Sequence, residues 1–246
     1  MSALKAARAI LANDMTRLLR DRFLLGTAAY IMSCAVALRW LVPWLEGELM
    51  GGSGFDIGPY TPLGVSYFVL VNSSVLTGMI GGFLLLESRE ERAIKALLVT
   101  PTPLSLHLGT LAAVIITAGL ILAAALAAAV GVGTPGWQPV MVSAALGAPT
   151  GVVIALILAT VASNKVEAFA VMKMTSFLGL IPVGAFFLPE PFQYAAGLFP
   201  PYWACKIWWV AAEGGGTWLW MVAPGALVSA AWIALLLRRF ITVAYR

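Results

Sequence analysis

The sequence has few charged residues and few side chains that could carry out chemistry. Asp, Glu, Lys and Arg make up 11% of the 246 residues and hydrophobic residues 61%, whereas soluble domains carry roughly 25% charged residues. The mean hydropathy of +0.93 and the long apolar runs predict an integral membrane protein. Strong alternation of apolar and polar residues is absent, so we expect the spans to be helices rather than barrel strands.

Candidate metal, redox and catalytic residues are also scarce. Cys34 and Cys205 lack the spacing of a metal site or a redox pair, and we interpret both as small buried hydrophobes. His107 has no second histidine or carboxylate at ligand spacing, which favours a structural role. The expected spans contain no Asp or Glu, and the chain has no GxSxG, HExxH or GxxxxGK[ST] motif. We therefore expect no enzyme activity, catalytic residue, metal or cofactor in this chain.

Six apolar runs are long enough to cross a bilayer. They predict an all-α polytopic protein with one transmembrane domain over residues 1–246. The expected spans are about 23–45, 63–86, 105–130, 140–162, 169–188 and 217–237. Pro182 falls inside the fifth span, where we expect a kink.

Residues 4–22 form a pattern typical of an amphipathic helix. Leu4, Leu11 and Leu18 lie along one side, and basic residues occupy the other faces. Such a helix is expected to lie on the membrane surface, although a solvated helix is the alternative. The segment has no small-residue cleavage site after a short apolar core, so we expect no cleaved signal peptide.

The charge distribution predicts the orientation. Most basic residues lie in the N-terminal helix, in the connection between spans two and three, and in the tail, whereas the opposite side carries Lys206, with Arg39 near the boundary. Residues 46–62 are acidic, rich in Gly and Pro and without a basic residue, which indicates an outer loop. Because basic residues gather on the cytoplasmic side of membrane proteins, both termini are expected in the cytoplasm. The same preference explains the pI near 9.3, so nucleic-acid binding is not needed to account for it.

Residues 189–216 fit neither a span nor an ordinary loop. Their apolar pieces are too short to cross the bilayer, and the segment as a whole is too apolar for a loop in water. Two apolar pieces flank Pro200-Pro201, and neither approaches the roughly 20 residues needed to cross. Aromatic residues are dense here, as they are at membrane interfaces. We expect a re-entrant or interface-lying helical hairpin on the outer side.

The second expected span is polar in its middle. Ser74, Gly78 and Gly82 repeat every four residues, a pattern that allows close approach of helices. Asn72 would be costly facing lipid, so this face is expected to meet protein or a water-accessible cavity. Ordinary packing and a substrate-lining role both remain open.

Residues 84–108 are the most informative stretch of the chain. An apolar span runs into clustered charges, which must lie in water, and a short helix ends near Pro101 and Pro103. Ile94, Leu97 and Leu98 have helical spacing. The connection therefore has an apolar face and a charged face, and something is expected to dock there.

This stretch, LLLESREERAIKALLVTPTPLS, resembles one that recurs in type-2 ABC exporter permeases. There, an acidic cluster ends the second span and is followed by a Leu-Leu helix and Thr-Pro. The order of surface helix, six spans, connecting hairpin and outer hairpin is similar over the whole chain, and the PPYW sequence is similar to bacterial drug-export relatives. The family often has glycine after the acidic cluster, whereas this chain has Arg92-Ala93, so we expect the helix to continue there.

The resemblance implies functional residues and partners. It identifies residues 88–104 as a coupling helix and 4–22 as a connecting helix, both docking on a separate ABC ATPase that binds ATP and Mg. The implied coupling residues are Glu87, Glu90, Glu91, Arg92, Ile94, Leu97, Leu98, Thr100 and Pro101. The implied substrate-cavity residues are Asn72, Ser73, Thr77, Thr175, Phe177 and Phe186.

The function expected from this resemblance is export across the bacterial cytoplasmic membrane. The chain would be the permease subunit of an ABC exporter, paired with a second six-span permease, identical or homologous, within membrane lipid. Few charges favour a hydrophobic or amphipathic cargo, such as a drug, lipid or natural product, over ions or sugars. The alternatives are an immunity or assembly scaffold without transport, and a secondary carrier, which the lack of titratable residues in the spans disfavours.

Overall fold

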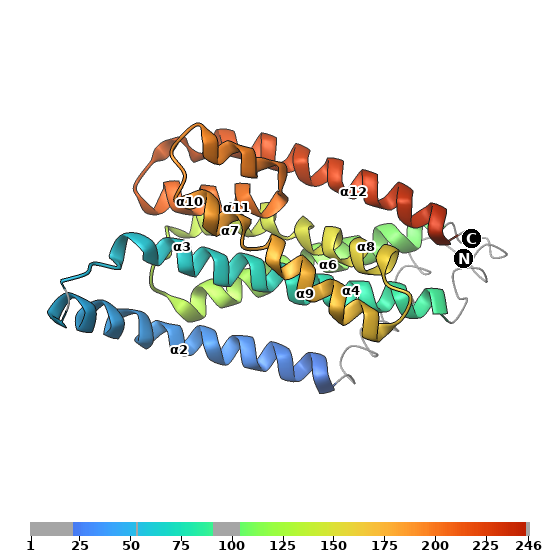
Figure 1. Ribbon diagram of the computed structural model, residues 1–246, viewed down its shortest axis with the longest axis horizontal. Coiled ribbons are helices and arrows are strands. Elements are labelled where there is room, and N and C mark those ends of the chain that lie inside the picture. The colour runs from blue at the N-terminus through green and yellow to red at the C-terminus, as the bar shows by residue number, and fades with distance from the viewer. Residues whose placement is uncertain (1–21, 53, 91–103, 245–246) are drawn as a thin grey trace.

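The computed structural model describes residues 22–52, 54–90 and 104–244, and within them every regular element is a helix (Figure 1). Six helical stretches in these ranges are long and apolar enough to cross a membrane, which confirms the expected fold class and span number. The protein is thus a multi-pass membrane protein.

The spans are built from continuous and interrupted helices. The first is α2 (Arg22–Gly52) and the third is α6 (Leu104–Val130). The second joins a 3₁₀ turn, η1 (Gly58–Tyr60), to α3 (Thr61–Ser66), the π-helix η2 (Tyr67–Val71) and α4 (Asn72–Glu90). The remaining elements are α7 (Trp137–Gly147) and α8 (Pro149–Val161) in the fourth span, α9 (Lys165–Leu178) and α10 (Ile181–Phe186) in the fifth, η3 (Phe192–Leu198) and α11 (Pro200–Ala212) in the hairpin, and η4 (Gly216–Met221) with α12 (Val222–Ala244) in the sixth.

Some helices extend beyond the predicted spans. α2 continues to Gly52, into the stretch predicted as an outer loop. Hydropathy marks where a chain leaves the hydrocarbon, whereas backbone hydrogen bonding can continue into water until residues such as Gly51 and Gly52 weaken the helix. α9 begins at Lys165 because Asn164 caps it, its Oδ1 accepting a hydrogen bond from the Glu167 N–H at 2.9 Å.

Prolines interrupt the fourth and fifth spans. Pro149 starts α8 directly after the turn at Ala148, and its missing N–H removes one helical hydrogen bond. In the fifth span α9 ends at Leu178 and α10 begins at Ile181, next to Pro182. The span therefore breaks just before the proline for which the sequence predicts a kink.

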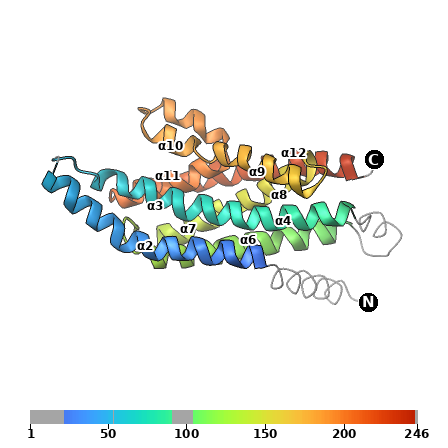
Figure 2. The ribbon, with the colours of Figure 1, turned by 60° about the horizontal axis from the view of Figure 1, so that its bottom comes forward.

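The second and fourth spans form the centre of the bundle. In each, 72% of the most apolar window is buried, against 6% in α2 and 22% in the η4–α12 span. Figure 1 shows α2 along one edge and α12 along the opposite edge, with α4, α6 and α8 between them. Figure 2, turned by 60°, shows α4 and α6 running alongside each other.

Small residues bring α4 and α8 together, as the repeat in the second span predicts. A Cβ on Gly78 would lie 2.7 Å from both the Gly151 carbonyl oxygen and Ile154 Cβ, and one on Gly82 would lie 2.9 Å from Leu158 Cβ. The Ser74 hydroxyl donates to the Gly147 carbonyl at 3.1 Å. The close approach of these two helices confirms the predicted packing pattern.

The hairpin helix α11 is buried within one end of the bundle. Tyr202 and Trp208 are fully buried. The Trp208 indole N–H donates to the Gly133 carbonyl at 3.0 Å, and the Trp209 indole N–H donates to Ser66 Oγ at 2.8 Å. α11 is thereby held against both the α6–α7 connection and α3. We call this the hairpin end of the bundle.

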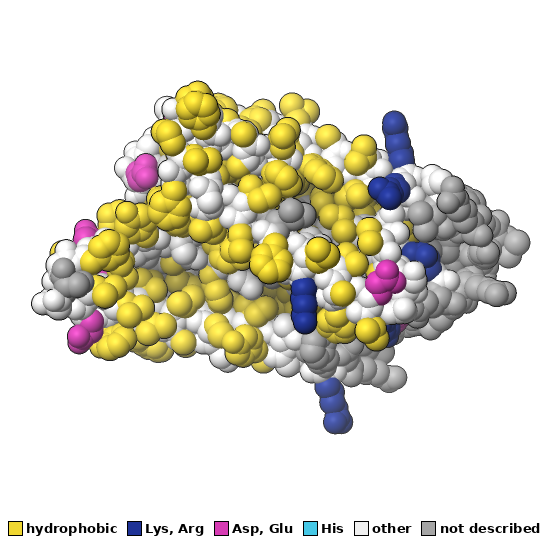
Figure 3. Space-filling view, in the orientation of Figure 1, with side chains coloured by type: hydrophobic (Ala, Val, Ile, Leu, Met, Phe, Trp, Pro, Cys, Tyr) yellow, Lys and Arg dark blue, Asp and Glu magenta, His cyan; other side chains and the backbone are white. Residues whose placement is uncertain are grey.

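The opposite end carries most of the basic residues of the described ranges, with Lys206 and Arg39 lying toward the hairpin end. Figure 3 shows apolar side chains over the middle of one face, with Lys and Arg gathered toward the end where α4 and α12 finish. We call this the charged end, and it includes Arg89, Lys165 and Arg238. An apolar belt bounded by charge on one side is the surface that a bilayer requires.

Candidate functional site

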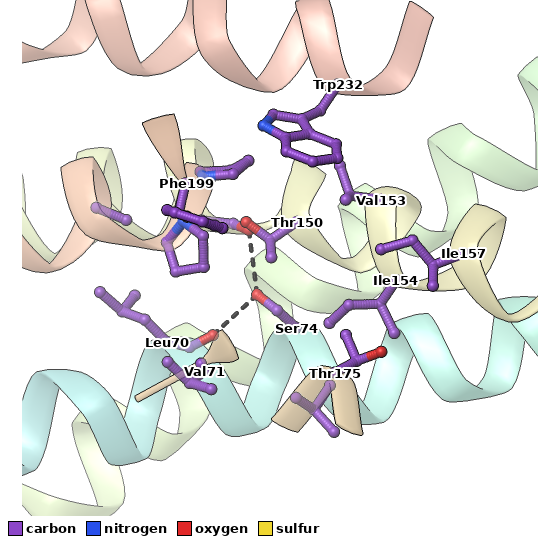
Figure 4. A pocket seen from close by; sticks show the side chains of 16 residues that line it. Leu70, Val71, Ser74, Thr150, Val153, Ile154, Ile157, Thr175, Phe199 and Trp232 are labelled. Carbon is purple, nitrogen blue, oxygen red and sulfur yellow. Dashed lines mark hydrogen bonds between the residues drawn. The ribbon is translucent and has the colours of Figure 1, made fainter. Parts of the chain in front are cut away.

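A narrow apolar crevice lies where five segments meet. It is bounded by η2 and α4, by α7 and α8, by α9, by the start of α11, and by α12 (Figure 4). Its volume is about 60 Å³. Its lining includes Leu70, Val71, Ser74, Thr150, Val153, Ile154, Thr175, Phe199 and Trp232.

Local features of the chain shape the crevice. The π-helix η2 ends at Val71 and presents Leu70 and Val71 to it; such π-turns are frequent at functional sites. The other wall comes from Phe199, which precedes α11, and from Trp232 of α12. The Trp232 indole N–H donates to the Leu198 carbonyl at 2.8 Å, which ties α12 to the hairpin.

Hydroxyl groups supply the polarity of this crevice. Ser74 Oγ donates to the carbonyls of Leu70 at 2.8 Å and Gly147 at 3.1 Å (Figure 4). Thr175 Oγ1 donates to the Val171 carbonyl at 2.9 Å. The Thr150 hydroxyl is buried and has no hydrogen-bond partner among the described residues. An unsatisfied buried hydroxyl costs about 1–3 kcal/mol, so a ligand atom that paired with it would remove that cost.

Of the six predicted cavity residues, Thr175 lines the crevice. Ser73 and Thr77 are buried within the bundle instead, and their hydroxyls donate to the carbonyls of Leu70 and Ser73. Thr77 Oγ1 lies 2.8 Å from where a Gly151 Cβ would be, so it fills the contact between α4 and α8.

The other three predicted cavity residues lie elsewhere. Asn72 is half-buried, and its amide donates to the Phe68 carbonyl at 2.9 Å. The Phe177 side chain is 72% exposed on the outside of the bundle. Phe186 packs edge-on against Trp209 at the hairpin end, with ring centroids 5.1 Å apart. The structure therefore does not bring the six together in one chain.

The lining of the crevice is apolar apart from its hydroxyl groups. It contains no ionisable residue, and no group of three or more metal-ligating side chains occurs within residues 22–52, 54–90 and 104–244. Ligand pockets usually measure about 300–1,000 Å³. The crevice must therefore widen before it admits a drug-sized molecule.

At the charged end, α4 is fastened to the turn between α8 and α9. The Arg89 guanidinium donates to the carbonyls of Ala159 and Ala162, which end α8. Glu87 forms an ion pair with Lys165, the first residue of α9. A cation on the last carbonyls of a helix is favoured by the helix dipole. The last turn of α4 is thus bonded to both neighbouring spans.

Most of the predicted coupling residues fall outside the described part of the chain. Glu87 is described in full, and Glu90 as the last residue of α4. The remaining seven, from Glu91 to Pro101, lie outside the described residues, as does the predicted connecting helix apart from Arg22.

A second polar cluster lies in the hairpin. The Lys206 ammonium donates to Glu190 Oε1 and to Gln193 Oε1, both at 2.9 Å. The Tyr194 hydroxyl donates to Glu190 at 3.1 Å, and the Tyr202 hydroxyl donates to Gln193 at 3.3 Å. The hydrogen bonds from Lys206 and then Tyr194 lower the pKa of the Glu190 carboxyl below its ordinary value.

Sequence reasoning missed Thr150, Phe199 and Trp232 as residues of the crevice. Thr150 directly follows Pro149 in the middle of the fourth span, and a hydroxyl beside a proline was the available signal. Phe199 and Trp232 are 33 positions apart and meet through the Trp232–Leu198 hydrogen bond. No spacing rule links them.

Comparison with known proteins gives consistent matches. The family described as "Fluoroquinolones export permease protein Rv2686c-like" matches residues 14–237. The chain is similar to fluoroquinolones export permease protein Rv2686c of Mycobacterium tuberculosis strain H37Rv, with 33% identity over 98% of this chain and 97% of the relative. It is equally similar to fluoroquinolones export permease protein MT2760 of M. tuberculosis strain CDC 1551, over the same shares.

Proposed function

Since the chain belongs to the Rv2686c-like family of fluoroquinolones export permeases, we propose that it is the membrane-spanning subunit of an ATP-driven ABC exporter. The observation that carries this proposal is the 33% identity to named export permeases over 98% of the chain. The cargo is a hydrophobic or amphipathic drug of the fluoroquinolone kind. The chain acts in the bacterial cytoplasmic membrane with both termini in the cytoplasm.

Energy for export comes from a separate subunit in this proposal. The chain has no GxxxxGK[ST] loop, so ATP and Mg bind to an ABC ATPase that docks on residues 88–104. Movement of that segment pulls on α4, and the Arg89 and Glu87 contacts transmit it to the α8–α9 turn. Both neighbouring spans line the crevice, so it widens when they move.

A complete transporter would contain two permease subunits. α2 has 6% of its apolar window buried and the α9–α10 span has 24%, so much of their apolar surface faces either lipid or a second six-span subunit. Thr175 of α9 lines the crevice, so a cargo path between two copies would include it.

The deciding experiment is purification of the tagged chain from its host in mild detergent, followed by mass spectrometry. We expect a stoichiometric partner that carries a GxxxxGK[ST] loop, and either one or two kinds of six-span permease. A chain that purifies alone in several detergents would overturn the proposal in favour of a scaffold.

The docking segment is tested by Leu97→Asp combined with Leu98→Asp. Two carboxylates on the apolar face should abolish ATPase co-purification, because they would be buried without partners at the interface. Membrane insertion should stay normal, since this segment lies outside the spans. The matched control is Met50→Asp with Phe55→Asp, which adds the same charge at exposed positions of the hairpin end. Unchanged co-purification in the Leu97/Leu98 variant would contradict the coupling assignment.

A further inference from the structure

A second, larger cavity lies in the charged half of the bundle, away from the crevice. It measures about 590 Å³ and is lined by α4, α6, α8 and α12. Its lining residues are all apolar: Leu85, Leu108, Gly109, Leu111, Ala112, Ile115, Val152, Ala155, Leu156, Ile233, Leu237 and Ile241.

The cavity is a groove between two helices. α6 and α12 each pack against α8, and Val152, Ala155 and Leu156 of α8 form the floor between them. A Cβ built on Gly109 would meet nothing within 4 Å, so the space beside this residue is open. The lining runs from Leu108 to Ile115 on α6 and from Ile233 to Ile241 on α12. At a rise of about 1.5 Å per residue, these stretches are about 10 Å and about 12 Å long.

The rim of this groove carries positive charge. Leu237 and Ile241 face the groove, and the exposed Arg238 lies on the same turn, about 60° around the helix from Ile241. Neither α6 nor α12 contains an Asp or Glu. An anion at the rim would therefore be attracted by Arg238. On α4, which also lines the groove, the carboxylate of Glu87 is paired with Lys165.

We propose that this groove binds one acyl chain of an anionic phospholipid, with the lipid phosphate on Arg238. An acyl chain gains little by leaving the bilayer for an equally apolar groove, so the headgroup must supply the selectivity. The guanidinium can donate two hydrogen bonds to a phosphate. A zwitterionic lipid also has a phosphate, but its headgroup carries a cation that Arg238 would repel. This site is separate from the transport crevice and does not rest on the proposed function.

The test is photo-crosslinking of the full chain in phosphatidylcholine vesicles that contain a diazirine-labelled lipid, either phosphatidylglycerol or phosphatidylcholine. Mass spectrometry then locates the labelled peptides. We expect phosphatidylglycerol to label the peptides around Leu108–Ile115 and Ile233–Ile241 at least fivefold more than phosphatidylcholine. Equal labelling by the two lipids would overturn the anionic selectivity.

Variants separate the groove from the general lipid surface. Gly109→Phe fills the groove and should reduce labelling at least fivefold, and Ala112→Leu should reduce it to a smaller extent. Gly26→Phe on α2 is the control, because a Cβ there also meets nothing within 4 Å. Arg238→Gln should reduce phosphatidylglycerol labelling several-fold and Arg238→Lys should restore part of it, whereas Arg239→Gln, on the opposite side of α12, should change it less than twofold.

Two results would refute the site. Labelling unchanged in both Gly109→Phe and Ala112→Leu would show that the lipid does not enter the groove. Crosslinking of Gly109→Cys to residues 4–22 would show that the chain's own N-terminal segment occupies it. Each variant's thermal unfolding is compared with that of Gly26→Phe, so that a folding defect is distinguished from a filled groove.

Discussion

Lys206 is buried at 8% exposure within the hairpin, where an unpaired ammonium would be strongly unfavourable. Its charge is balanced by Glu190, and Gln193 accepts a second hydrogen bond. The two partners differ in burial: counting side chains alone, Glu190 is 55% exposed and Lys206 is 10% exposed. The pair therefore stabilises the hairpin chiefly by making the burial of Lys206 tolerable.

The lowered pKa of Glu190 predicts a pH-dependent hairpin. The folded-state pKa of Glu190 lies below the ordinary pKa of a carboxyl. Its contribution to stability is therefore complete at a pH above the ordinary pKa and is lost as the pH falls through the folded-state pKa. Glu190→Gln should cost about 0.2–1 kcal/mol at pH 7. The cost is small because the carboxylate is half-exposed and screened, and because the glutamine oxygen can still accept a hydrogen bond from Lys206, which also keeps its bond to Gln193. The variant should also lose less stability than the parent between pH 5 and pH 3, roughly the range where carboxyls titrate.

The measurement is thermal unfolding in detergent at several pH values, monitored by tryptophan fluorescence. Glu213→Gln, which removes an exposed carboxylate at the end of α11, is the control and should behave as the parent does. Parallel loss of stability with falling pH in the parent and in Glu190→Gln would disprove the role of this pair.

Among the elements, the α4–α8 contact decides how tightly the bundle centre packs. Ser74, Gly78 and Gly82 of α4 face Gly147, Ile154 and Leu158 of the fourth span. Dispersion forces and a few hydrogen bonds hold helices together inside a bilayer, where the hydrophobic effect gives little. Small residues matter there because they bring the two backbones within contact distance.

Gly78→Ala tests this contact directly. Its Cβ would lie 2.7 Å from the Gly151 carbonyl oxygen, so α4 and α8 must separate, and overpacking of this kind costs about 1–3 kcal/mol. Gly64→Ala on α3 is the matched control, because a Cβ there meets nothing within 4 Å, and it should be neutral or stabilising by up to about 1 kcal/mol. The midpoint of thermal unfolding measures both, and equal midpoints for the two variants would contradict the close-packing argument.

At the scale of the whole molecule, a buried pair of spans is surrounded by helices with largely exposed apolar surfaces. The second and fourth spans are each 72% buried in their apolar windows, and the first is 6% buried. The central pair provides stability within one chain. The outer spans present most of the apolar surface that faces away from the bundle.

The energy source of transport is also a property of the whole molecule. The expected spans contain no Asp or Glu that could carry protons through the bilayer. In cells that express the chain with its ATPase partner, fluoroquinolone accumulation should fall several-fold. This effect should persist when a proton ionophore collapses the gradient and disappear when ATP is depleted. Fluorescence of the intracellular drug measures both, and sensitivity to the ionophore at constant ATP would favour a secondary carrier.

Much of the fold could be predicted because a bilayer imposes it. Apolar runs of about 20 residues must form helices there, since no water satisfies the backbone. Hydropathy alone therefore found the spans, although it ended α2 at residue 45 rather than at Gly52. The repeat of Ser74, Gly78 and Gly82 likewise predicted a close helix contact.

The candidate site was less predictable. Of the residues assigned to the cavity, Thr175 lines the crevice, whereas Phe177 is exposed and Phe186 packs at the hairpin end. Position along a span does not determine which way a side chain points once helices break, as they do after Leu178 and before Pro149. Burial of α11 likewise depends on indole hydrogen bonds to distant segments.

The sequence by itself thus determined the helical class, the six spans and the charged end of this protein, because each follows from the solvent around the chain. The tertiary structure alone decided that Thr150, Phe199 and Trp232 share a crevice, and that Arg89 binds the end of α8. These contacts join residues between 33 and 82 positions apart, or 70 and 73 positions apart for Arg89. They arise only when the whole bundle is packed, since no local pattern encodes which helix will lie opposite.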